Sequence, residues 1–324
     1  MIRFAYLVTL LLALVTPPLL IASEHNHSCP HGDLSPQFCD RDGDMLADPE
    51  TDPAKWLDPY ELVFGYTQNQ TLHEGAKKAL ARHIEKATGK KVRYFLYRTN
   101  AAQLEAMRNG MLHIVALNTG SVPIGVECSG FRLFGMAAKA DRSYGYTMML
   151  ISYPGSRITR VEDARDKTIL FVTPTSNSGY KAPHLLLQST YSMSEGIDYK
   201  VRFSGSHTKS ILAVSHREFK VAAIADGVLS SMIDAGRIDP DSIKILYTSQ
   251  TYPGTGYGYP YNLNPELARK IEEAFFTFEM RDASGKLLDV NKYHDALFIP
   301  AEYKEKWAIV RTIDRFSNPD QSCR

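Results

Sequence analysis

A run of short hydrogen-bond donors, Ser176, Asn177 and Ser178, lies between a strand-like segment and a helix-like segment. The start of a helix presents unpaired backbone N–H groups and the positive end of the helix dipole. Hydroxyl and amide side chains at that point add further donors, and together these groups suit a tetrahedral oxyanion. The alternative is ordinary N-capping of the helix by the same residues.

Two further junctions have the same character. His207 begins a helix directly after the strand-like segment 200–205, and Asn118, Thr119, Gly120 and Ser121 form a comparable cap nearer the N-terminus. Ligands of open α/β sheets bind where the carboxyl ends of strands meet helix N-termini. We therefore expect these junctions to face one crevice, although a lone histidine at such a position is often only a cap or a surface residue.

Ser178, His207 and Asp226 can also be written as a catalytic triad in the chain order Ser, His, Asp. A triad requires a histidine that contacts both partners, which the sequence does not reveal. The chain carries no G-x-S-x-G, H-E-x-x-H, P-loop or C-x-x-C motif. We predict a protein that is not an enzyme and keep a hydrolase as the last alternative.

Alternating strand and helix patterns position these junctions. A first set of strands is predicted at 61–67, 91–99 and 113–120, and a second at 168–174, 200–205, 221–227 and 243–250, with single helices between them. Two long helices, 265–280 and 302–316, are expected to close the chain, with no strand after about residue 261. Strands separated by single helices indicate an α/β fold with parallel sheets.

The restart of this pattern predicts two α/β lobes, with the second inserted into the first. We assign 59–147 and 252–324 to lobe 1 and 148–251 to lobe 2. The expected architecture is that of a two-lobed binding protein with a ligand cleft at a two-strand hinge, whose crossings lie around 147–154 and 247–253. Such a protein captures its ligand by closure of the lobes.

Residues 1–22 read as a cleaved signal peptide, because Arg3 precedes an apolar stretch and Ala22 offers a small residue for cleavage. Export through such a signal predicts a periplasmic protein. The alternative is an uncleaved membrane anchor, for which the apolar stretch is close to the lower length limit.

Residues 23–58 form a Cys- and Asp-rich extension. In an oxidising compartment, Cys29 and Cys39 are expected to close a small disulfide loop. Cys323, the penultimate residue, either is left unpaired or pairs with an N-terminal cysteine. Cys128 is either a buried small apolar residue or a free thiol near the ligand.

The extension also contains a candidate metal site at Asp40, Asp42, Asp44 and Asp48. Alternate acidic residues in a Gly-containing loop turn their oxygens towards one centre, as a hard cation such as Ca²⁺ requires. The position of the glycine and the residue at the twelfth position differ from those of an EF-hand loop. A solvated acidic turn that binds no metal is therefore the alternative. Any ion here would be structural, and no other cofactor is predicted.

The charge balance excludes one class of partner. The chain of 324 residues has 37 basic and 36 acidic side chains, and the two signs are interleaved throughout. Nucleic-acid binding needs a concentrated basic stripe that releases counterions from phosphates. We therefore predict no nucleic-acid partner.

Taken together, several segments resemble a known family, the periplasmic substrate-binding proteins of phosphate, phosphite and phosphonate ABC transporters. The resemblance covers most of the chain and is carried by ELVFGYT, NAAQLEAMRNGMLHIVALNTG, the Gly145-Tyr146 pair, PTSNSGY, FSGSH and VAAIADGVLSSM. It implies that Ser176, Asn177, Ser178 and His207 hold the oxyanion and that Tyr146 faces it from the hinge. Asn118, Thr119, Gly120 and Ser121 would close on it from lobe 1, and the membrane partner would be an ABC permease.

The chain departs from this family in two places. Members that take aminoalkyl phosphonates carry two acidic residues for the ammonium group, whereas TYPGTGYGYP contains no acid and only Asp226 remains. The first-lobe loop LNTGSVP lacks the tyrosine that is frequent there. Since an unpaired charge in a cleft is costly, a smaller or uncharged ligand is expected to fit better.

Arsenite-binding sensor proteins resemble the same family, act on a membrane histidine kinase and depend on a cysteine in the cleft. Cys128 follows the first-lobe loop and would supply that thiol. The arsenite sensor is therefore our alternative to the oxyanion receptor.

Overall fold

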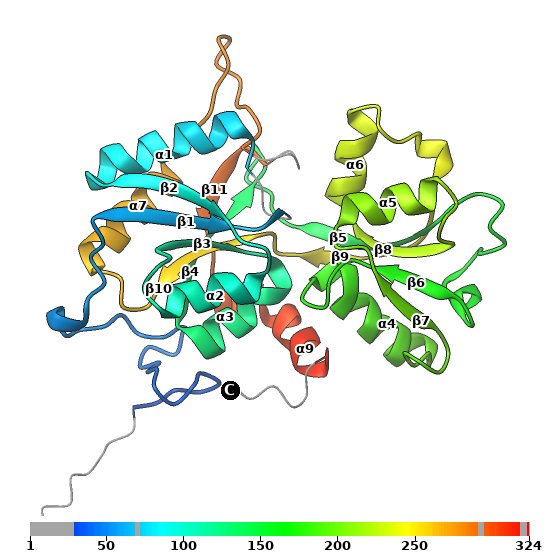
Figure 1. Ribbon diagram of the computed structural model, residues 1–324, viewed down its shortest axis with the longest axis horizontal. Coiled ribbons are helices and arrows are strands. Elements are labelled where there is room, and N and C mark those ends of the chain that lie inside the picture. The colour runs from blue at the N-terminus through cyan, green and yellow to red at the C-terminus, as the bar shows by residue number, and fades with distance from the viewer. Residues whose placement is uncertain (1–28, 69–71, 291–294, 318–322, 324) are drawn as a thin grey trace, which may run out of the picture.

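A computed structural model describes residues 29–68, 72–290, 295–317 and 323. Two β-sheets, each with helices packed against it, form two lobes that lie side by side (Figure 1). The predicted α/β class and two-lobed architecture are confirmed. The predicted signal peptide lies outside the described residues, and within them no helix is both long and apolar enough to span a membrane.

Lobe 1 is built on a six-stranded sheet with the order β11-β4-β10-β3-β1-β2. Its strands are β1 (Glu61–Tyr66), β2 (Lys91–Leu96), β3 (Ile114–Leu117), β4 (Phe131–Ala138), β10 (Gly256–Pro260) and β11 (Leu297–Pro300). β1 runs parallel to β2 and β3, whereas β10 is antiparallel to β3 and β4. The sheet is therefore mixed, because β10 enters directly from β9 of lobe 2 and β11 follows it after α7, both antiparallel to β4.

Helices cover both faces of this sheet. One face carries α1 (Glu74–Thr88) and α7 (Pro265–Phe276), and the other carries α2 (Asn100–Arg108) and α3 (Val122–Ser129). Successive residues of β1 are buried in opposite directions, with Phe64 in the cluster under α1 and α7 and Val63 in the cluster under α2. Burial on both faces explains why the strands read as continuous apolar runs.

Lobe 2 is built on a five-stranded sheet with the order β7-β6-β8-β5-β9. Its elements are β5 (Tyr146–Ser152), β6 (Thr168–Phe171), α4 (Ala182–Tyr191), β7 (Lys200–Phe203), α5 (His207–Ser215), β8 (Val221–Ala225), α6 (Asp226–Asp234) and β9 (Lys244–Tyr252). β6, β7 and β8 are parallel, so their carboxyl ends share one edge of the sheet.

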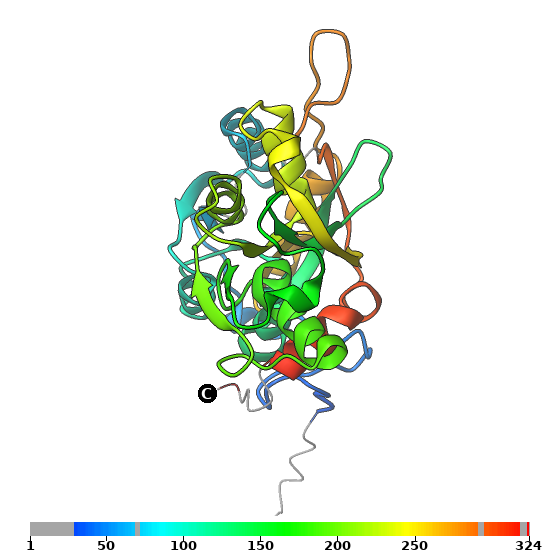
Figure 2. The same ribbon diagram turned by 90° about the vertical axis from the view of Figure 1, so that its right-hand side faces the viewer.

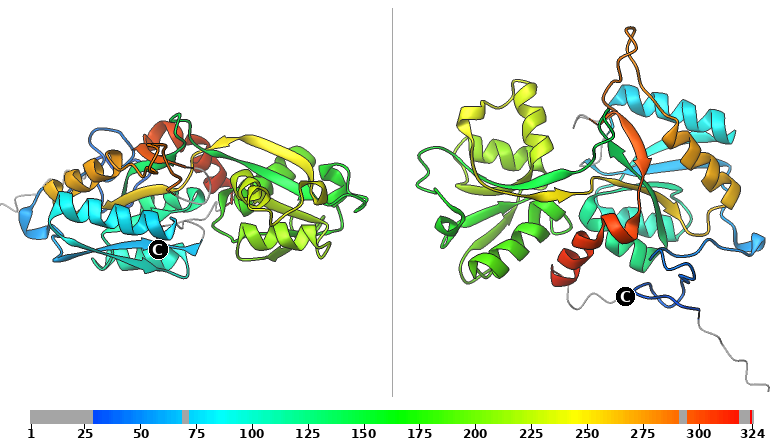
Figure 3. Two further views of the ribbon diagram at one scale, coloured as in Figure 1. Left: turned by 90° about the horizontal axis from the view of Figure 1, so that it is seen from above. Right: turned by 180° about the vertical axis from the view of Figure 1, so that it is seen from behind.

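The two lobes are joined by the segments 139–145 and 253–255, which connect β4 to β5 and β9 to β10. The expected crossings at 147–154 and 247–253 lie largely within β5 and β9, the two strands that pair with each other in the second sheet next to these segments. Figure 3 shows the paired strands extending towards lobe 1. Gly145 permits the close approach at this point, with φ of 92° and a Cβ position only 2.4 Å from the Tyr252 carbonyl oxygen.

The C-terminal part differs from the expected pair of helices. β11 (Leu297–Pro300) adds an edge strand to the first sheet, antiparallel to β4, so the prediction of no later strand is wrong. A paired turn bridged by Arg281 and Leu287 projects from the lobe (orange in Figure 2). The last helix is divided into α8 (Tyr303–Lys306) and α9 (Ala308–Ser317), and α9 contacts α4 of lobe 2.

The N-terminal extension packs onto lobe 1. The predicted disulfide between Cys29 and Cys39 is present, and Leu34, Phe38 and Leu46 are buried in the core of the lobe. The backbone N–H of Ser35 donates to the carbonyl of Glu127, at 2.8 Å. The extension therefore contributes its apolar side chains to a core that it could not form alone.

The second disulfide joins Cys128 in α3 to Cys323. Neither the free thiol nor the isolated buried residue expected for Cys128 is correct, and Cys323 does not pair with an N-terminal cysteine. A residue at the end of the chain is brought to α3 because α9 packs beside that helix. The two cysteines are 195 positions apart in the sequence, so no local pattern predicts their pairing.

The acidic loop brings together three of its four predicted ligands. Oxygens of Asp40, Asp42 and Asp44 lie within 4.8 Å of one another, whereas Asp48 forms an ion pair with Arg41 at 2.7 Å. Burial raises the pKa of the Asp44 carboxyl, and the charges of Asp42 and Asp40 act in the same direction. Calcium binding here stays a prediction.

Candidate ligand-binding site

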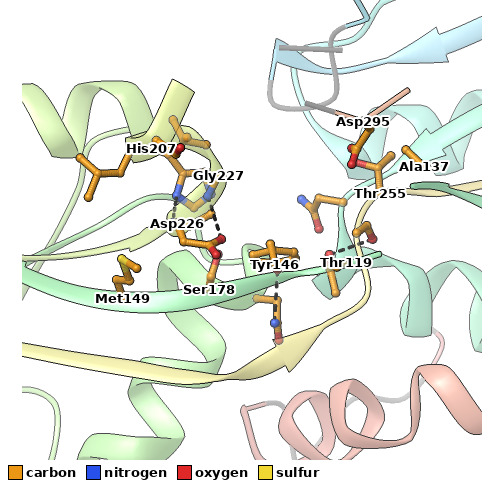
Figure 4. Close-up of a pocket in the computed structure, with 18 of the residues that line it drawn as sticks. Thr119, Ala137, Tyr146, Met149, Ser178, His207, Asp226, Gly227, Thr255 and Asp295 are labelled. Carbon is orange, nitrogen blue, oxygen red and sulfur yellow. Dashed lines mark hydrogen bonds between the residues drawn. The ribbon is translucent and has the colours of Figure 1, made fainter. Parts of the chain in front are cut away.

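A cavity of about 710 Å³ lies between the two lobes. Predicted site residues line it from both lobes and the hinge: Asn118, Thr119, Tyr146, Ser176, Asn177, Ser178, His207 and Asp226. Gly120, Ser121 and Cys128 do not line it. Figure 4 shows the lobe 2 residues around Ser178 and Asp226, with Thr119 facing them from lobe 1.

The segment after β6 holds the central donors. Residues Asn177–Lys181 form one π-helical turn, and the Ser176 hydroxyl accepts from the backbone N–H of Gly179 at 3.0 Å. Ser176 is thus an N-cap, as the alternative interpretation held, while Ser178 lies beside Asp226 in the cavity. A Cβ on Gly179 would meet the Val172 side chain at 2.5 Å, so only glycine lets the turn pack this closely on the strand end.

Tyr146 stands where the chain enters lobe 2. Its hydroxyl accepts a hydrogen bond from the Asn177 side-chain amide at 3.4 Å. Burial raises the pKa of this phenol, whereas hydrogen bonds with Thr119, Asn177 and Ser178 lower it. The net pKa lies above the ordinary value, so Tyr146 keeps its proton at neutral pH and can donate a hydrogen bond to an anion.

His207 is oriented by the backbone of the neighbouring strand. Its Nδ1 accepts from the backbone N–H of Ala225 at 3.1 Å, so the proton of the neutral ring is on Nε2. A Ser-His-Asp triad needs both ring nitrogens, one for each partner. Because Nδ1 is already engaged by a backbone amide, the geometry does not support the triad of Ser178, His207 and Asp226.

The cavity contains a second carboxylate that sequence reasoning missed. Asp226 was predicted as the one remaining acid, but Asp295 also lines the cavity, from lobe 1 (Figure 4). Lys139, from the first crossing segment, lines it as well. No local motif marks Asp295 or Lys139, because only the packing of the lobes brings them to the site.

Part of the cavity wall is apolar. Met149 of β5 and Val228, Leu229 and Ile233 of α6 line it next to Asp226. The residues after Asp226 could have been anticipated, since they begin a helix at the same sheet edge. An apolar wall beside a cluster of donors can hold an organic substituent as well as an anion.

Thr119 and Gly120 serve the contact between the lobes more than the cavity. The Thr119 hydroxyl lies 2.8 Å from the carbonyl oxygen of Pro253 and 3.0 Å from that of Gly254, in the second crossing segment. A Cβ on Gly120 would lie 2.5 Å from the Thr175 carbonyl oxygen, so the lobes touch here. Ser121 is buried behind this contact, and its backbone N–H donates to Asn118.

A buried ion pair strengthens the same contact. Lys181 of lobe 2 pairs with Asp314 of α9, and its ammonium also donates to the carbonyl of Gly120 at 2.8 Å. Each side chain is only 5% exposed. The lobes are therefore joined by charge and close packing on one side of the cavity.

Residues 64–306 match the model of a protein family described as ABC transporter, phosphonate, periplasmic substrate-binding protein. The chain belongs to this family. The resemblance predicted from the motifs is thereby confirmed, and the arsenite-sensing branch receives no support.

Individual members are only distantly similar. The phosphate-import protein PhnD of Mycolicibacterium smegmatis is 23% identical over 249 residues, which cover 72% of this chain and 75% of that protein. A binding protein component of a phosphonate ABC transporter from Pseudomonas aeruginosa aligns with a TM-score of 0.62 and 20% identity, covering 82% of this chain and 91% of its own. PhnD1 of Prochlorococcus marinus, solved with methylphosphonate, aligns with a TM-score of 0.65 and 16% identity, covering 81% of this chain and 99% of its own. These structures share the fold.

Proposed function

We propose that this protein captures a small phosphorus oxyanion, of the phosphonate, phosphite or phosphate class, and delivers it to an ABC permease in the membrane. The observation that carries the proposal is the gathering of hydrogen-bond donors from both lobes and the hinge around one cavity. Family membership supports it, and one relative is named for phosphate import while another was solved with methylphosphonate.

The donors suit an anion in geometry and charge. Tyr146, Ser178 and His207 come from separate elements and line the same space. Hydrogen bonds from such donors to an ionised oxygen are stronger than those between neutral groups. No proton transfer or bond cleavage is required of any of these residues.

Closure follows from the arrangement of the lobes. Ser178 and His207 belong to lobe 2, and Asn118 belongs to lobe 1. A ligand that contacts both sides favours the closed state only through contacts that the open state lacks. The short segments 139–145 and 253–255 are where the chain would bend.

The state and position of Cys128 do not fit an arsenite site. Arsenite binding through Cys128 requires a thiolate, and Cys128 is held in a disulfide with Cys323 and does not line the cavity. A histidine kinase was expected as partner only if Cys128 supplied a thiol, so we do not propose that partner.

Thermal unfolding of the mature protein with phosphate, phosphite or methylphosphonate tests the proposal. A ligand that binds only the folded state raises the unfolding midpoint. Replacing Ser178 with alanine is expected to weaken binding by about 1.5 to 3 kcal/mol, roughly 10- to 150-fold, because a hydrogen bond to an ion is lost. Ser189→Ala, on the exposed face of α4, is the matched control and should bind as the wild type does. No midpoint shift with any phosphorus oxyanion would reject the proposal.

A further inference from the structure

The cavity extends well beyond its group of hydrogen-bond donors. Its volume of about 710 Å³ falls in the range of about 300 to 1,000 Å³ that is typical of pockets for drug-sized organic ligands. A phosphorus oxyanion that carries no more than a methyl group fills only a small part of such a space. The residues that line the remainder therefore bear on which substituent the ligand carries.

Helix α6 supplies one side of the cavity over two turns. Asp226, Leu229 and Ile233 line it and are three or four positions apart, so they share one face of the helix. At about 1.5 Å per residue, this face runs for about 10 Å from the start of the helix. Ser178 lies beside Asp226 at the first turn (Figure 4), so the second turn leads away from the donors.

Beyond the first turn, this wall is apolar. Val228 and Leu229 are each only 5% exposed and belong to a hydrophobic core cluster of lobe 2. Ile233 and Met149 of β5 pack against the same cluster but are only partly buried, and both line the cavity. Ser230 adds a hydroxyl group to the wall and no charge. The far part of the cavity is therefore bounded by an open edge of the lobe 2 core.

The charged groups of the cavity lie elsewhere. Asp295 lines it from lobe 1, across from Met149 on the lobe 2 side (Figure 4), and Lys139 lines it from the first crossing segment. Asp226 is at the donor end, where two backbone N–H groups donate to its Oδ1. A charged substituent on the apolar wall would lose hydration without compensation. An apolar substituent would instead cover surface that is unfavourable to leave in water.

We propose that the ligand is an organic phosphonate with an uncharged, apolar substituent of several carbons, which lies along α6 against Leu229, Ile233 and Met149. The phosphonate group itself is held beside Ser178. This inference rests on the proposed function and narrows the ligand class, because phosphate and phosphite carry no substituent that could reach the wall. The flexible, polarisable side chain of Met149 lets the wall adapt to substituents of different shape.

Affinity should then grow with the length of the substituent. Each methylene group that becomes fully buried is expected to raise affinity about fourfold. From methylphosphonate to pentylphosphonate, the gain approaches roughly 200-fold if every added methylene is buried. The heat-capacity change of binding should become more negative along the same series, because more apolar surface leaves water.

The test is titration calorimetry at several temperatures with methyl-, propyl- and pentylphosphonate and with 2-aminoethylphosphonate. The last compound has the shape of propylphosphonate but ends in an ammonium group, so wild type should bind propylphosphonate more tightly. Ile233→Asn places an amide in the wall and should reduce the preference for pentylphosphonate over methylphosphonate. Ile197→Asn is the matched control and should keep the wild-type preference, because Ile197 is 83% exposed and does not line the cavity.

Three results would overturn the inference. They are a wild-type affinity that stays flat or falls from methyl- to pentylphosphonate, tighter wild-type binding of 2-aminoethylphosphonate than of propylphosphonate, and a folded Ile233→Asn variant with the full wild-type preference. The first two use wild-type protein and do not depend on the folding of a variant. A flat series would mean that closure of the lobes covers the wall and the ligand does not. If neither phosphate, phosphite nor any phosphonate binds, the proposed function is rejected instead.

Discussion

The two lobes meet in two different ways, on opposite sides of a single turn of chain. On one side, Ser178 faces an open cavity lined by hydroxyl, amide and imidazole groups. On the other, Lys181, three residues later, is buried against Asp314 and the carbonyl of Gly120. The same pairing of lobes is hollow and polar in one place and closely packed in the other.

This difference indicates how the molecule moves. A packed contact with a buried ion pair resists separation, whereas the cavity can change shape at little cost. The lobes are therefore expected to pivot about the contact formed by Gly120, Lys181 and Asp314 while the cavity opens and closes. Variants of this contact should change stability, and variants of the cavity should change affinity.

The largest effect is expected from Lys181→Met. Removing one member of a buried ion pair typically costs about 3 to 5 kcal/mol, because the other charge stays in a site shielded from water. Denaturant unfolding measures the loss. The double variant Lys181→Met/Asp314→Leu should recover part of the lost stability, because no unpaired charge remains buried. If Lys181→Met alone were as stable as wild type, Lys181 and Asp314 would not form a fixed contact between the lobes.

The disulfide of Cys128 and Cys323 should contribute slightly less. Replacing both cysteines with serine is expected to destabilise the protein by about 2 to 4 kcal/mol, because the unfolded chain gains freedom over a long loop. Ligand affinity, measured by calorimetry, should be unchanged, since neither residue lines the cavity. Loss of binding in a folded variant would connect the disulfide to the site after all.

Gly120→Ala tests the close approach of the lobes directly. The new methyl group would overlap the backbone at Thr175 and Asn177, which cannot yield as a flexible side chain would. Overpacking of this kind costs about 1 to 3 kcal/mol. Thermal unfolding should show the loss, with Gly254→Ala as the control because its Cβ position has open space.

Glu127 should give the smallest effect, and one that depends on pH. Burial raises its pKa to about 7, and the charges of Asp314 and Asp33 add to this. The folded state then binds a proton more tightly than the unfolded state, so stability is greatest below the unfolded pKa and falls as pH rises towards 7. The expected fall is about 1 kcal/mol, since the group is only partly buried. Glu127→Gln should flatten this part of a melting profile, and an unchanged slope would contradict the prediction.

The sequence by itself determined the α/β class, the two lobes and a set of polar residues that line the cavity. Apolar periodicity and helix caps are local, so residues such as Ser176 and His207 could be recognised from the strands and helices around them. The shared carboxyl edge of parallel strands then brought those junctions together. The nine residues between Cys29 and Cys39 likewise made that disulfide predictable.

Only the tertiary structure decided which of several neighbouring residues line the cavity and which form the contact between the lobes. Ser178 and Lys181 are three positions apart, yet Ser178 lines the cavity and Lys181 lies in a buried contact. Gly120 does not line the cavity but permits the close contact between the lobes. The partners of Lys181 and Cys128, and the arrival of Asp295 in the cavity, come from segments far along the chain. Contacts of this kind leave no local pattern, because they are set by how two finished lobes pack against each other.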